Sequence, residues 1–185
     1  MKRVIDGSEI ARILERLTFQ VIETVPDLKE LALIGIHRRG VWLAERIRKI
    51  IEKHRGILLD LGSLDITFFR DDLGEIDYLP KAFSTDISFS VTGRAILLVD
   101  DVLYTGRTVK AALDAISEFG RPSRILMAAL VDRGHREYPI HADFIGKKIP
   151  TGLSEEVLVH LSEIDGEDNV YIGVPSTDTK IGGNS

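Results

Sequence analysis

Three short runs of uniformly apolar residues constrain this chain more than any other feature. They read LALIGI at residues 31–36, AILLVD at 95–100 and RILMAALVD at 124–132. A strand with one face in water alternates apolar with polar residues, whereas a strand of a parallel sheet is covered on both faces and is apolar throughout. The runs therefore predict buried strands of a parallel sheet, which needs helical crossovers between them.

Segments with helical periodicity separate the apolar runs, as this prediction requires. Three helices are expected, at residues 8–25 with Ser8 as the N-cap, at 41–54, and at about 105–119. A further strand is expected at LDITFF, residues 64–69. The alternation predicts an α/β fold with an open, mainly parallel twisted sheet flanked by helices.

The composition favours one cytoplasmic domain and excludes several classes of protein. The chain has 185 residues, of which 44% are apolar, enough for a single core. It has no cysteine, which excludes a disulfide framework, a thiolate metal site and a cysteine nucleophile. No apolar run approaches the ~20 residues needed to cross a bilayer, and a net charge of -5 gives no general attraction for nucleic acid. We expect one domain over residues 1–174 and a disordered tail over 175–185.

Two regions lie outside the alternation of strands and helices. Residues 70–92 are rich in Asp, Gly and Pro without periodicity. A long connection of this kind is usually a functional loop, so we expect a flexible flap. Towards the end of the chain, VLVHL (157–161) and NVYIGV (169–174) flank a polar stretch and predict a terminal hairpin.

The apolar run at 95–100 leads into two adjacent carboxylates, Asp100 and Asp101. The carboxyl end of a parallel strand opens into the ligand crevice, so both side chains should face a ligand. TGRT at 105–108 follows at the expected helix start and offers a glycine, free N–H groups and two hydroxyls, which suit a phosphate group. Carboxylates repel phosphate but accept hydrogen bonds from hydroxyls. The motif therefore predicts a sugar phosphate with free 2′- and 3′-hydroxyls.

Three alternative interpretations agree less well with the residues of this motif. A phosphate loop of the G-x-x-x-x-G-K-[ST] type would need a glycine and a lysine where Asp101 and Arg107 stand. A phosphoacceptor receiver domain places its acidic pair near its own start, whereas Asp100 and Asp101 lie past the middle of this chain. A purely structural role accounts for Thr105 as a helix cap, yet not for two carboxylates after a buried strand, where each is costly without a partner.

AILLVDDVLYTGRT at residues 95–108 resembles the signature of type I phosphoribosyltransferases, which bind phosphoribosyl pyrophosphate (PRPP). More narrowly, the motifs DITFFRDDL, VDDVLYTGRT, VDRGHREYPI and ADFIGKKIPT resemble, in this order, the PyrR family of pyrimidine operon attenuators and uracil phosphoribosyltransferases. The resemblance covers residues 9–174. It implies the type I phosphoribosyltransferase fold, with a flexible flap and a small hood region. It also implies transfer of the phosphoribosyl group from PRPP to uracil, giving UMP and pyrophosphate.

The resemblance further implies a role for each site residue. Asp100 and Asp101 would be catalytic by holding the ribose hydroxyls and stabilising positive charge on the ring, while Arg38 and Arg39 would bind the pyrophosphate. The other expected binding residues form four groups: the 5′-phosphate loop of Val102, Leu103, Tyr104, Thr105, Gly106, Arg107 and Thr108; the pyrophosphate turn with His37 and Gly40; the flap with Arg70, Asp71 and Asp72; and the base region with Arg133, Phe144 and Ile145. The pyrophosphate turn of this fold class often contains a non-proline cis peptide bond. Magnesium would accompany PRPP, held mainly by the substrate's own oxygens and without direct protein ligands.

Regulation by RNA is the family's second activity, in which UMP or UTP favours binding to the leader mRNA of pyrimidine genes. A basic stripe on the second helix could meet RNA phosphates, although such a run is more often a solvated face; it comprises Arg46, Lys49 and Lys53. The first helix carries Glu15 and Phe19 where an RNA-facing surface would be more polar or basic.

Three functional alternatives stay open at this point. The chain is expected to be an active uracil phosphoribosyltransferase that also regulates through RNA. It could instead be a regulator with vestigial catalysis, or a transferase for hypoxanthine or guanine without RNA binding, because the PRPP machinery is shared among type I enzymes. The family further suggests a homodimer or a dimer of dimers, and Trp42 is as good a candidate for a subunit contact as for the core.

Overall fold

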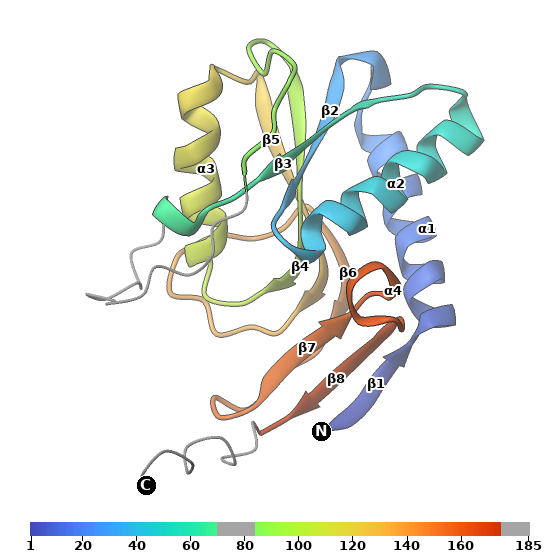
Figure 1. Ribbon diagram of the computed structural model, residues 1–185, viewed down its shortest axis with the longest axis vertical. Coiled ribbons are helices and arrows are strands. Elements are labelled where there is room, and N and C mark those ends of the chain that lie inside the picture. The colour runs from blue at the N-terminus through green and yellow to red at the C-terminus, as the bar shows by residue number, and fades with distance from the viewer. Residues whose placement is uncertain (70–83, 175–185) are drawn as a thin grey trace, which may run out of the picture.

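The centre of the fold is a five-stranded sheet in which neighbouring strands run parallel (Figure 1). The computed structural model describes residues 1–69 and 84–174. Across the sheet the strands follow the order β3 (Asp60–Leu64), β2 (Leu31–Ile36), β4 (Ala95–Leu103), β5 (Arg124–Asp132) and β6 (Phe144–Lys148). β2 is buried along its whole length, because strands cover both of its edges and helices cover both faces. The parallel sheet predicted from the apolar runs is confirmed.

Three long helices cover the two faces of this sheet (Figure 1). They are α1 (Gly7–Thr24), α2 (Arg39–Arg55) and α3 (Arg107–Phe119), and a 3-10 turn, η1 (Leu28–Glu30), precedes β2. Alternate residues of each strand serve the two layers: Leu31 and Leu33 belong to the core beneath α1 and α2, whereas Ile34 packs with α3. The α/β architecture with helices on both faces is thus confirmed. Within the described residues, the structure contains no helix with the length and apolarity that a bilayer crossing requires.

A second, smaller sheet lies at the end of the molecule toward which β4 runs (Figure 1). Its strands are antiparallel and follow the order β1 (Lys2–Asp6), β8 (Asn169–Gly173) and β7 (Glu156–His160), with the short helix α4 (Ser162–Asp165) between β7 and β8. Val157, Val159 and Val170 join this sheet to the main core. The terminal hairpin expected from the sequence is confirmed by the pairing of β7 with β8.

The strand expected at residues 64–69 is wrong. β3 ends at Leu64, and a 3-10 turn, η2 (Thr67–Phe69), follows it. Asp65 causes the break, because its Oδ1 accepts hydrogen bonds from the Thr67 N–H at 2.9 Å and from the Thr67 hydroxyl at 2.5 Å. A side chain that bonds to the backbone two residues ahead favours a turn over a strand.

The starts of two helices also differ from expectation. Asp6, not Ser8, caps α1: its Oδ1 accepts a hydrogen bond from the Glu9 N–H at 2.9 Å, and the Ser8 hydroxyl donates to the same oxygen at 2.7 Å. α3 begins at Arg107 rather than near Thr105. Gly106 has a φ of 90°, a left-handed conformation that cannot continue back into the helix.

The prediction of a flexible flap at residues 70–92 is wrong for the end of this range, from Asp86 on. Ser63 and Asp86 exchange two backbone hydrogen bonds, at 2.8 and 2.9 Å. Val91 is fully buried, and Ile87 and Phe89 pack against the core on the α3 side of the sheet. The expected flap residues Arg70, Asp71 and Asp72, like the expected tail, lie outside the described residues.

The turn between β2 and α2 packs its backbone directly against neighbouring backbone. A Cβ atom on Gly35 would lie 2.3 Å from the Val41 Cα, and one on Gly40 would lie 2.3 Å from the Val99 carbonyl oxygen. Real side chains do not approach so closely, so glycine at these two positions allows the turn to lie against the end of β4.

Replacing Gly35 by alanine should therefore destabilise the fold. We expect Gly35→Ala to lower the free energy of unfolding by about 1–3 kcal/mol, because the added methyl group must displace backbone rather than a flexible side chain. Urea denaturation followed by circular dichroism measures the change. Gly152→Ala is the matched control, since its Cβ would meet nothing nearer than 3.5 Å. Equal stability of the two variants would contradict the packing argument.

Candidate functional site

The sequence-predicted carboxylates lie where the strand order of the main sheet reverses. From β2 the chain proceeds outward to β3, and from β4 it proceeds in the opposite direction to β5 and β6. A ligand crevice in an open α/β sheet forms outside the carboxyl ends of the strands at such a reversal. Asp100 and Asp101 lie toward the carboxyl end of β4, beside the turn that follows β2. The topology thus puts the acidic pair at the position where this fold class binds ligands.

The acidic pair is held by its own backbone. The Asp101 N–H donates to the Asp100 carboxylate at 2.9 Å, and the Val102 N–H donates to the Asp101 carboxylate at 3.0 Å. Asp100 is buried and Asp101 half-buried. Burial raises the pKa of Asp100 well above its ordinary value, and the negative charge of Asp101 raises it further. Burial also raises the pKa of Asp101, although the hydrogen bond with Asp100 and the positive charge of Arg39 oppose the rise. The two carboxyl groups therefore tend to retain a proton between them.

The predicted pyrophosphate turn lies directly beside this pair. Its Gly40 touches the backbone of Val99 and Asp100. The peptide bond between His37 and Arg38 is cis, as expected for this turn. Burial lowers the pKa of His37, and the charge of Asp65 partly offsets this effect. The turn leads straight into α2, whose first N–H groups lack partners within the helix and carry its positive dipole end.

The two arginines of this turn lie in different surroundings. Arg39 donates from one Nη to both carboxylate oxygens of Asp165, at 2.9 and 3.2 Å, while its Nε is a buried donor with no partner among the described residues. Arg38 lines a hollow of about 340 Å³ together with the half-exposed Trp42. The positive charge of Arg39 lowers the pKa of Asp101. Through its ion pair with Asp165, Arg39 also connects the turn to α4.

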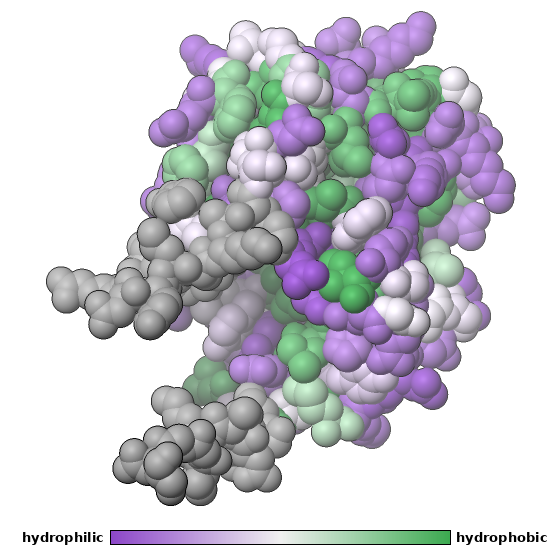
Figure 2. Space-filling view, viewed as in Figure 1, coloured by the Kyte–Doolittle hydropathy of each residue, from purple (hydrophilic) through white to green (hydrophobic). Residues whose placement is uncertain are grey.

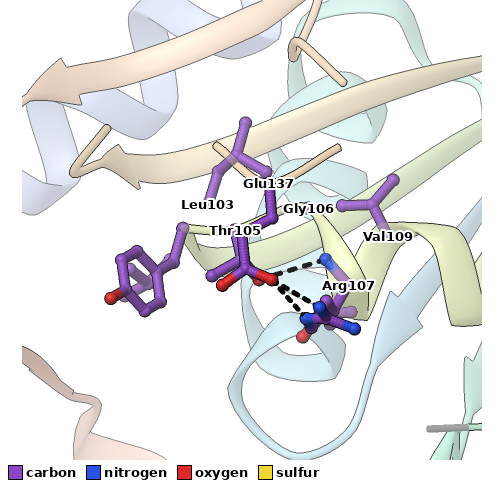
Figure 3. A pocket seen from close by; sticks show the side chains of 9 residues that line it. Leu103, Thr105, Gly106, Arg107, Val109 and Glu137 are labelled. Carbon is purple, nitrogen blue, oxygen red and sulfur yellow. Dashed lines mark hydrogen bonds and ion pairs between the residues drawn. The ribbon is translucent and has the colours of Figure 1, made fainter. Parts of the chain in front are cut away.

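The predicted 5′-phosphate loop surrounds a pocket of about 390 Å³ at the start of α3 (Figure 3). Its wall comprises Val102, Leu103, Tyr104, Thr105, Gly106, Arg107, Thr108, Val109 and Glu137. The left-handed Gly106 turns the chain into α3, and the Thr105 hydroxyl oxygen accepts a hydrogen bond from the Arg107 N–H at 3.2 Å. The pocket therefore contains hydroxyl groups and a helix N-terminus, the arrangement that binds phosphate in many proteins. All seven residues predicted for this loop line it.

A second loop, residues 133–140, holds the phosphate loop in place. The Arg133 N–H donates to the Leu103 carbonyl at 3.1 Å, and the N–H groups of Glu137 and Tyr138 donate to the Thr105 carbonyl at 2.9 and 3.0 Å. This support was not predicted from the sequence. The motif VDRGHREYPI contributed to the family resemblance, but residues this far along the chain carry no local signal for hydrogen bonds to residues 103–105.

Arg136 is the main side chain in this support. Its guanidinium donates to the Tyr104 carbonyl at 2.6 Å, to the Ile140 carbonyl at 2.9 Å and to the Asp132 carboxylate at 2.6 Å. These bonds fix the turn at Tyr104 from behind. Arg136 therefore helps to fix the position of the phosphate loop.

The residues expected to contact a base are only partly brought to the site. Arg133 is buried, with its guanidinium 4.0 Å from the Tyr104 ring centroid, and it donates to the Thr151 hydroxyl at 3.1 Å. Phe144 and Ile145, in contrast, start β6 and pair with Ala128 and Ala129 in the middle of β5. Phe144 is a core residue, whereas the partly exposed Ile145 lies level with Asp100, because both residues pair with Ala129.

The carboxyl edge next to Arg133 carries a further hollow, of about 430 Å³. It is lined mostly by polar and basic residues: Asp132, Arg133, Gly134, His135, Arg136, His141, Lys148, Pro150 and Thr151. Lys148 lies at the end of β6. Of the residues that line this hollow, only Arg133 was predicted as a site residue.

One residue of the basic stripe expected on α2 is occupied by internal partners. Arg46 donates to the carboxylates of Glu163 and Asp168 at 2.6–2.9 Å, which connects α2 to the segment around α4. Lys49 is well exposed and lies 3.5 Å from Glu45. Arg46 therefore stabilises the fold and does not offer its charge to RNA.

Comparison with known proteins identifies the family of the chain. A family model described as phosphoribosyl transferase domain matches residues 2–159. A protein of Thermus thermophilus named bifunctional protein PyrR is 53% identical over 169 residues, 91% of this chain and 93% of its own. A protein of Chloroflexus aurantiacus with the same name is 50% identical over 171 residues, 92% of this chain and 94% of its own.

Solved structures show the same fold at low sequence identity. A hypoxanthine phosphoribosyltransferase from Staphylococcus aureus is 20% identical, with a TM-score of 0.68 over 94% of this chain and 91% of that one. The hypoxanthine phosphoribosyltransferase of Trypanosoma cruzi, solved with its product IMP, is 15% identical, with a TM-score of 0.67 over 94% of this chain and 90% of that one. With a matching family model and relatives about half identical over nearly the whole chain, this protein belongs to the PyrR family of type I phosphoribosyltransferases.

Proposed function

We propose that the protein transfers the 5-phosphoribosyl group from PRPP to uracil, forming UMP and releasing pyrophosphate. One observation carries the proposal: a half-buried and a buried carboxylate at the sheet's reversal point lie between two helix N-termini, α2 on one side and α3 on the other. A substrate with a diol between two phosphate groups fits this order of charges. Membership of the PyrR family supports uracil as the base.

The geometry of the three parts suggests how the substrate lies. The 5′-phosphate occupies the pocket formed by residues 102–108, and the ribose hydroxyls donate to Asp100 and Asp101. The pyrophosphate meets the turn with His37 and Gly40, where Arg38 and Arg39 supply positive charge. We extend the proposal to the flap residues Arg70, Asp71 and Asp72, which would cover the bound substrate, on the strength of the sequence motif.

Catalysis follows from charge placed on both sides of the breaking bond. As the bond between ribose C1 and the pyrophosphate oxygen lengthens, the ring becomes positive and the leaving group more negative. An ionised Asp101 stabilises the ring, and the arginines stabilise the pyrophosphate. Uracil N1 then bonds to C1 and loses its proton to the leaving group or to solvent. No protein nucleophile is needed.

Magnesium enters this proposal as part of the substrate. In the described residues no three His, Asp or Glu side chains gather into a metal site. The oxygens of PRPP suit Mg²⁺, a cation that keeps several waters and uses few protein ligands. When bound, the ion would neutralise charge on the leaving pyrophosphate. Asp100 and Asp101 border the position where the diol and the pyrophosphate meet, so their charge suits such a complex without direct coordination.

Regulation through RNA is the second part of the proposal. The relatives are named bifunctional, and their similarity extends over more than nine-tenths of this chain. The hollow beside Arg133 presents His135, His141 and Lys148 at the surface, a local set of basic groups that phosphates could contact. On α1, by contrast, Phe19 packs on His54, with 4.9 Å between the ring centroids. We therefore place RNA at the hollow, with UMP or UTP favouring the bound form.

Two further proposals concern the setting of the protein. The partly exposed Trp42 supports a subunit contact in a homodimer or a dimer of dimers. The cysteine-free sequence suits the cytoplasm.

The substrate proposal predicts a clear preference among bases. Pyrophosphate release from PRPP and Mg²⁺ should be rapid with uracil and slow with hypoxanthine or guanine. Asp101→Asn should lower kcat/KM with uracil by about tenfold or more, because the charge of Asp101 matters most as the ring cation develops. A preference for hypoxanthine or guanine would show that uracil is not the substrate. Absence of turnover with every base would favour a regulator with vestigial catalysis. A kcat/KM of Asp101→Asn near that of the wild type would refute the role assigned to Asp101.

The raised pKa of Asp100 predicts an unusual dependence of stability on pH. Its folded pKa lies above the ordinary value of 3.8, so the folded protein binds more protons than the unfolded chain in the interval between the two values. Stability from this group then falls as pH rises through that interval, by at most about 1.4 kcal/mol per pH unit for one proton. We expect Asp100→Asn to flatten the curve and to be more stable than wild type at neutral pH.

Urea denaturation from about pH 4 to about pH 8 tests this expectation. Asp114→Asn is the control, because Asp114 is an exposed carboxylate paired with Lys110 on α3. An Asp100→Asn variant whose stability relative to wild type does not increase as pH rises over this interval would show that the buried pair is held ionised.

The RNA proposal predicts binding that depends on salt and on UMP. A pyrimidine-gene leader hairpin should bind more tightly than an unrelated hairpin in fluorescence anisotropy, and added UMP should tighten it. Lys148→Glu should weaken binding about tenfold or more, whereas Lys49→Glu, the same charge change on the exposed face of α2, should not. Equal affinity for both hairpins would refute regulation through RNA.

A further inference from the structure

One carboxylate lies in the 5′-phosphate pocket among groups suited to bind an anion. Glu137 comes from the loop 133–140 and faces Arg107 across the pocket (Figure 3). The remaining wall, residues 102–109, contributes hydroxyl groups, backbone N–H groups and the N-terminus of α3. A negative side chain at this place opposes the binding of a phosphate group, so its presence needs a physical reason.

Glu137 is held by Arg107, the cation of the pocket. The Glu137 Oε2 accepts a hydrogen bond from the Arg107 Nε at 2.6 Å, and it lies 2.5 Å from an Arg107 Nη. One carboxylate oxygen thus takes two adjacent donors of the guanidinium, the same donors that would serve a phosphoryl oxygen. Both side chains are partly exposed, 36% for Arg107 and 49% for Glu137, so the pair can open without leaving a buried charge.

The backbone of Glu137 keeps its side chain at the pocket. Its N–H donates to the Thr105 carbonyl at 2.9 Å, and the next N–H, of Tyr138, donates to the same oxygen. Glu137 is therefore tied to the phosphate loop itself. Only its side chain can turn away when another anion arrives.

Arg107 has a second support that does not depend on Glu137. Its guanidinium carbon lies 5.4 Å from the Tyr138 ring centroid, within the range of a cation–π contact. Loss of the Glu137 carboxylate would leave this contact in place. Glu137 is therefore better placed to compete for the guanidinium than to orient it.

We propose that Glu137 is an internal competitor of the substrate's 5′-phosphate: it occupies Arg107 in the empty pocket, and a bound phosphoryl group displaces it. The inference rests on the proposed function, because it takes the pocket to be the 5′-phosphate site. Its consequence is a built-in reduction of affinity for every ligand that carries this phosphate. Such a reduction would apply to PRPP and UMP alike and would favour release of the product.

The test measures ribose 5-phosphate binding to the full-length protein by isothermal titration calorimetry, because this probe carries the sugar and the 5′-phosphate alone. We expect Glu137→Gln to bind it about fivefold more tightly, which corresponds to about 1 kcal/mol, the upper range for a partly exposed ion pair. In steady-state assays the KM for PRPP should fall while kcat does not rise.

Asp114→Asn is the matched control. Asp114 is 49% exposed, as Glu137 is, and pairs with Lys110 on α3, so its loss changes the net charge equally without touching the pocket. Its affinity should equal that of the wild type. A second comparison combines Glu137→Gln with Arg107→Met: in the absence of the guanidinium, the gain from Glu137→Gln should vanish.

Each other outcome overturns the proposal in a distinguishable way. Unchanged or weaker binding by Glu137→Gln, with a wild-type melting curve, would mean that Glu137 only positions Arg107. A gain that persists without Arg107, or appears equally in Asp114→Asn, would reduce the effect to general repulsion. If neither the wild type nor Glu137→Gln binds ribose 5-phosphate, the assignment of the pocket, and hence the proposed function, fails as well.

Discussion

The close approach of the turn after β2 to the end of β4 is the constraint on which the site depends. Two glycines make it possible, Gly35 behind the turn and Gly40 within it, because any Cβ there would collide with backbone. The contact brings the start of α2 against Val99 and Asp100. The positive end of a helix and the acidic pair thus become neighbours through backbone packing, with no long side chain needed to reach between them.

The second half of the site is positioned by a different device. The phosphate loop is not held by a neighbouring turn but by hydrogen bonds from residues 133–140 to its carbonyl groups. The loop can therefore present its N–H groups and hydroxyls outward while its carbonyl oxygens are satisfied from behind. Because residues 133–140 support the phosphate loop, its pocket also includes Glu137 from that segment. On the face shown in Figure 2, hydrophilic side chains cover much of the surface around apolar patches.

How much of this the sequence could predict depends on the range of the forces involved. Buried strands and their helices were predictable, because uniform apolarity and helical periodicity are local patterns, and the acidic pair followed from its place after a buried strand. The strand at 64–69 failed because the single side chain of Asp65 makes a turn. β1 and β6 were not expected, because each has only five residues with mixed polarity. The burial of Phe144 could not be predicted from its motif, because it depends on the pairing of β6 with β5.

The arginines mark the limit most clearly. A sequence shows that Arg39, Arg46 and Arg136 are near a site or on a helix face, but not whether a carboxylate elsewhere in the chain already binds them. Arg46 and Arg136 prove to be satisfied internally, while Arg39 keeps a buried Nε donor without a described partner. The ion pairs of Arg39 with Asp165 and of Arg46 with Asp168 each join residues more than a hundred positions apart. Only the fold therefore decides which positive charges remain available to a ligand. Electrostatic function in this family is therefore a property of the tertiary structure, even where the motif that names the family is local.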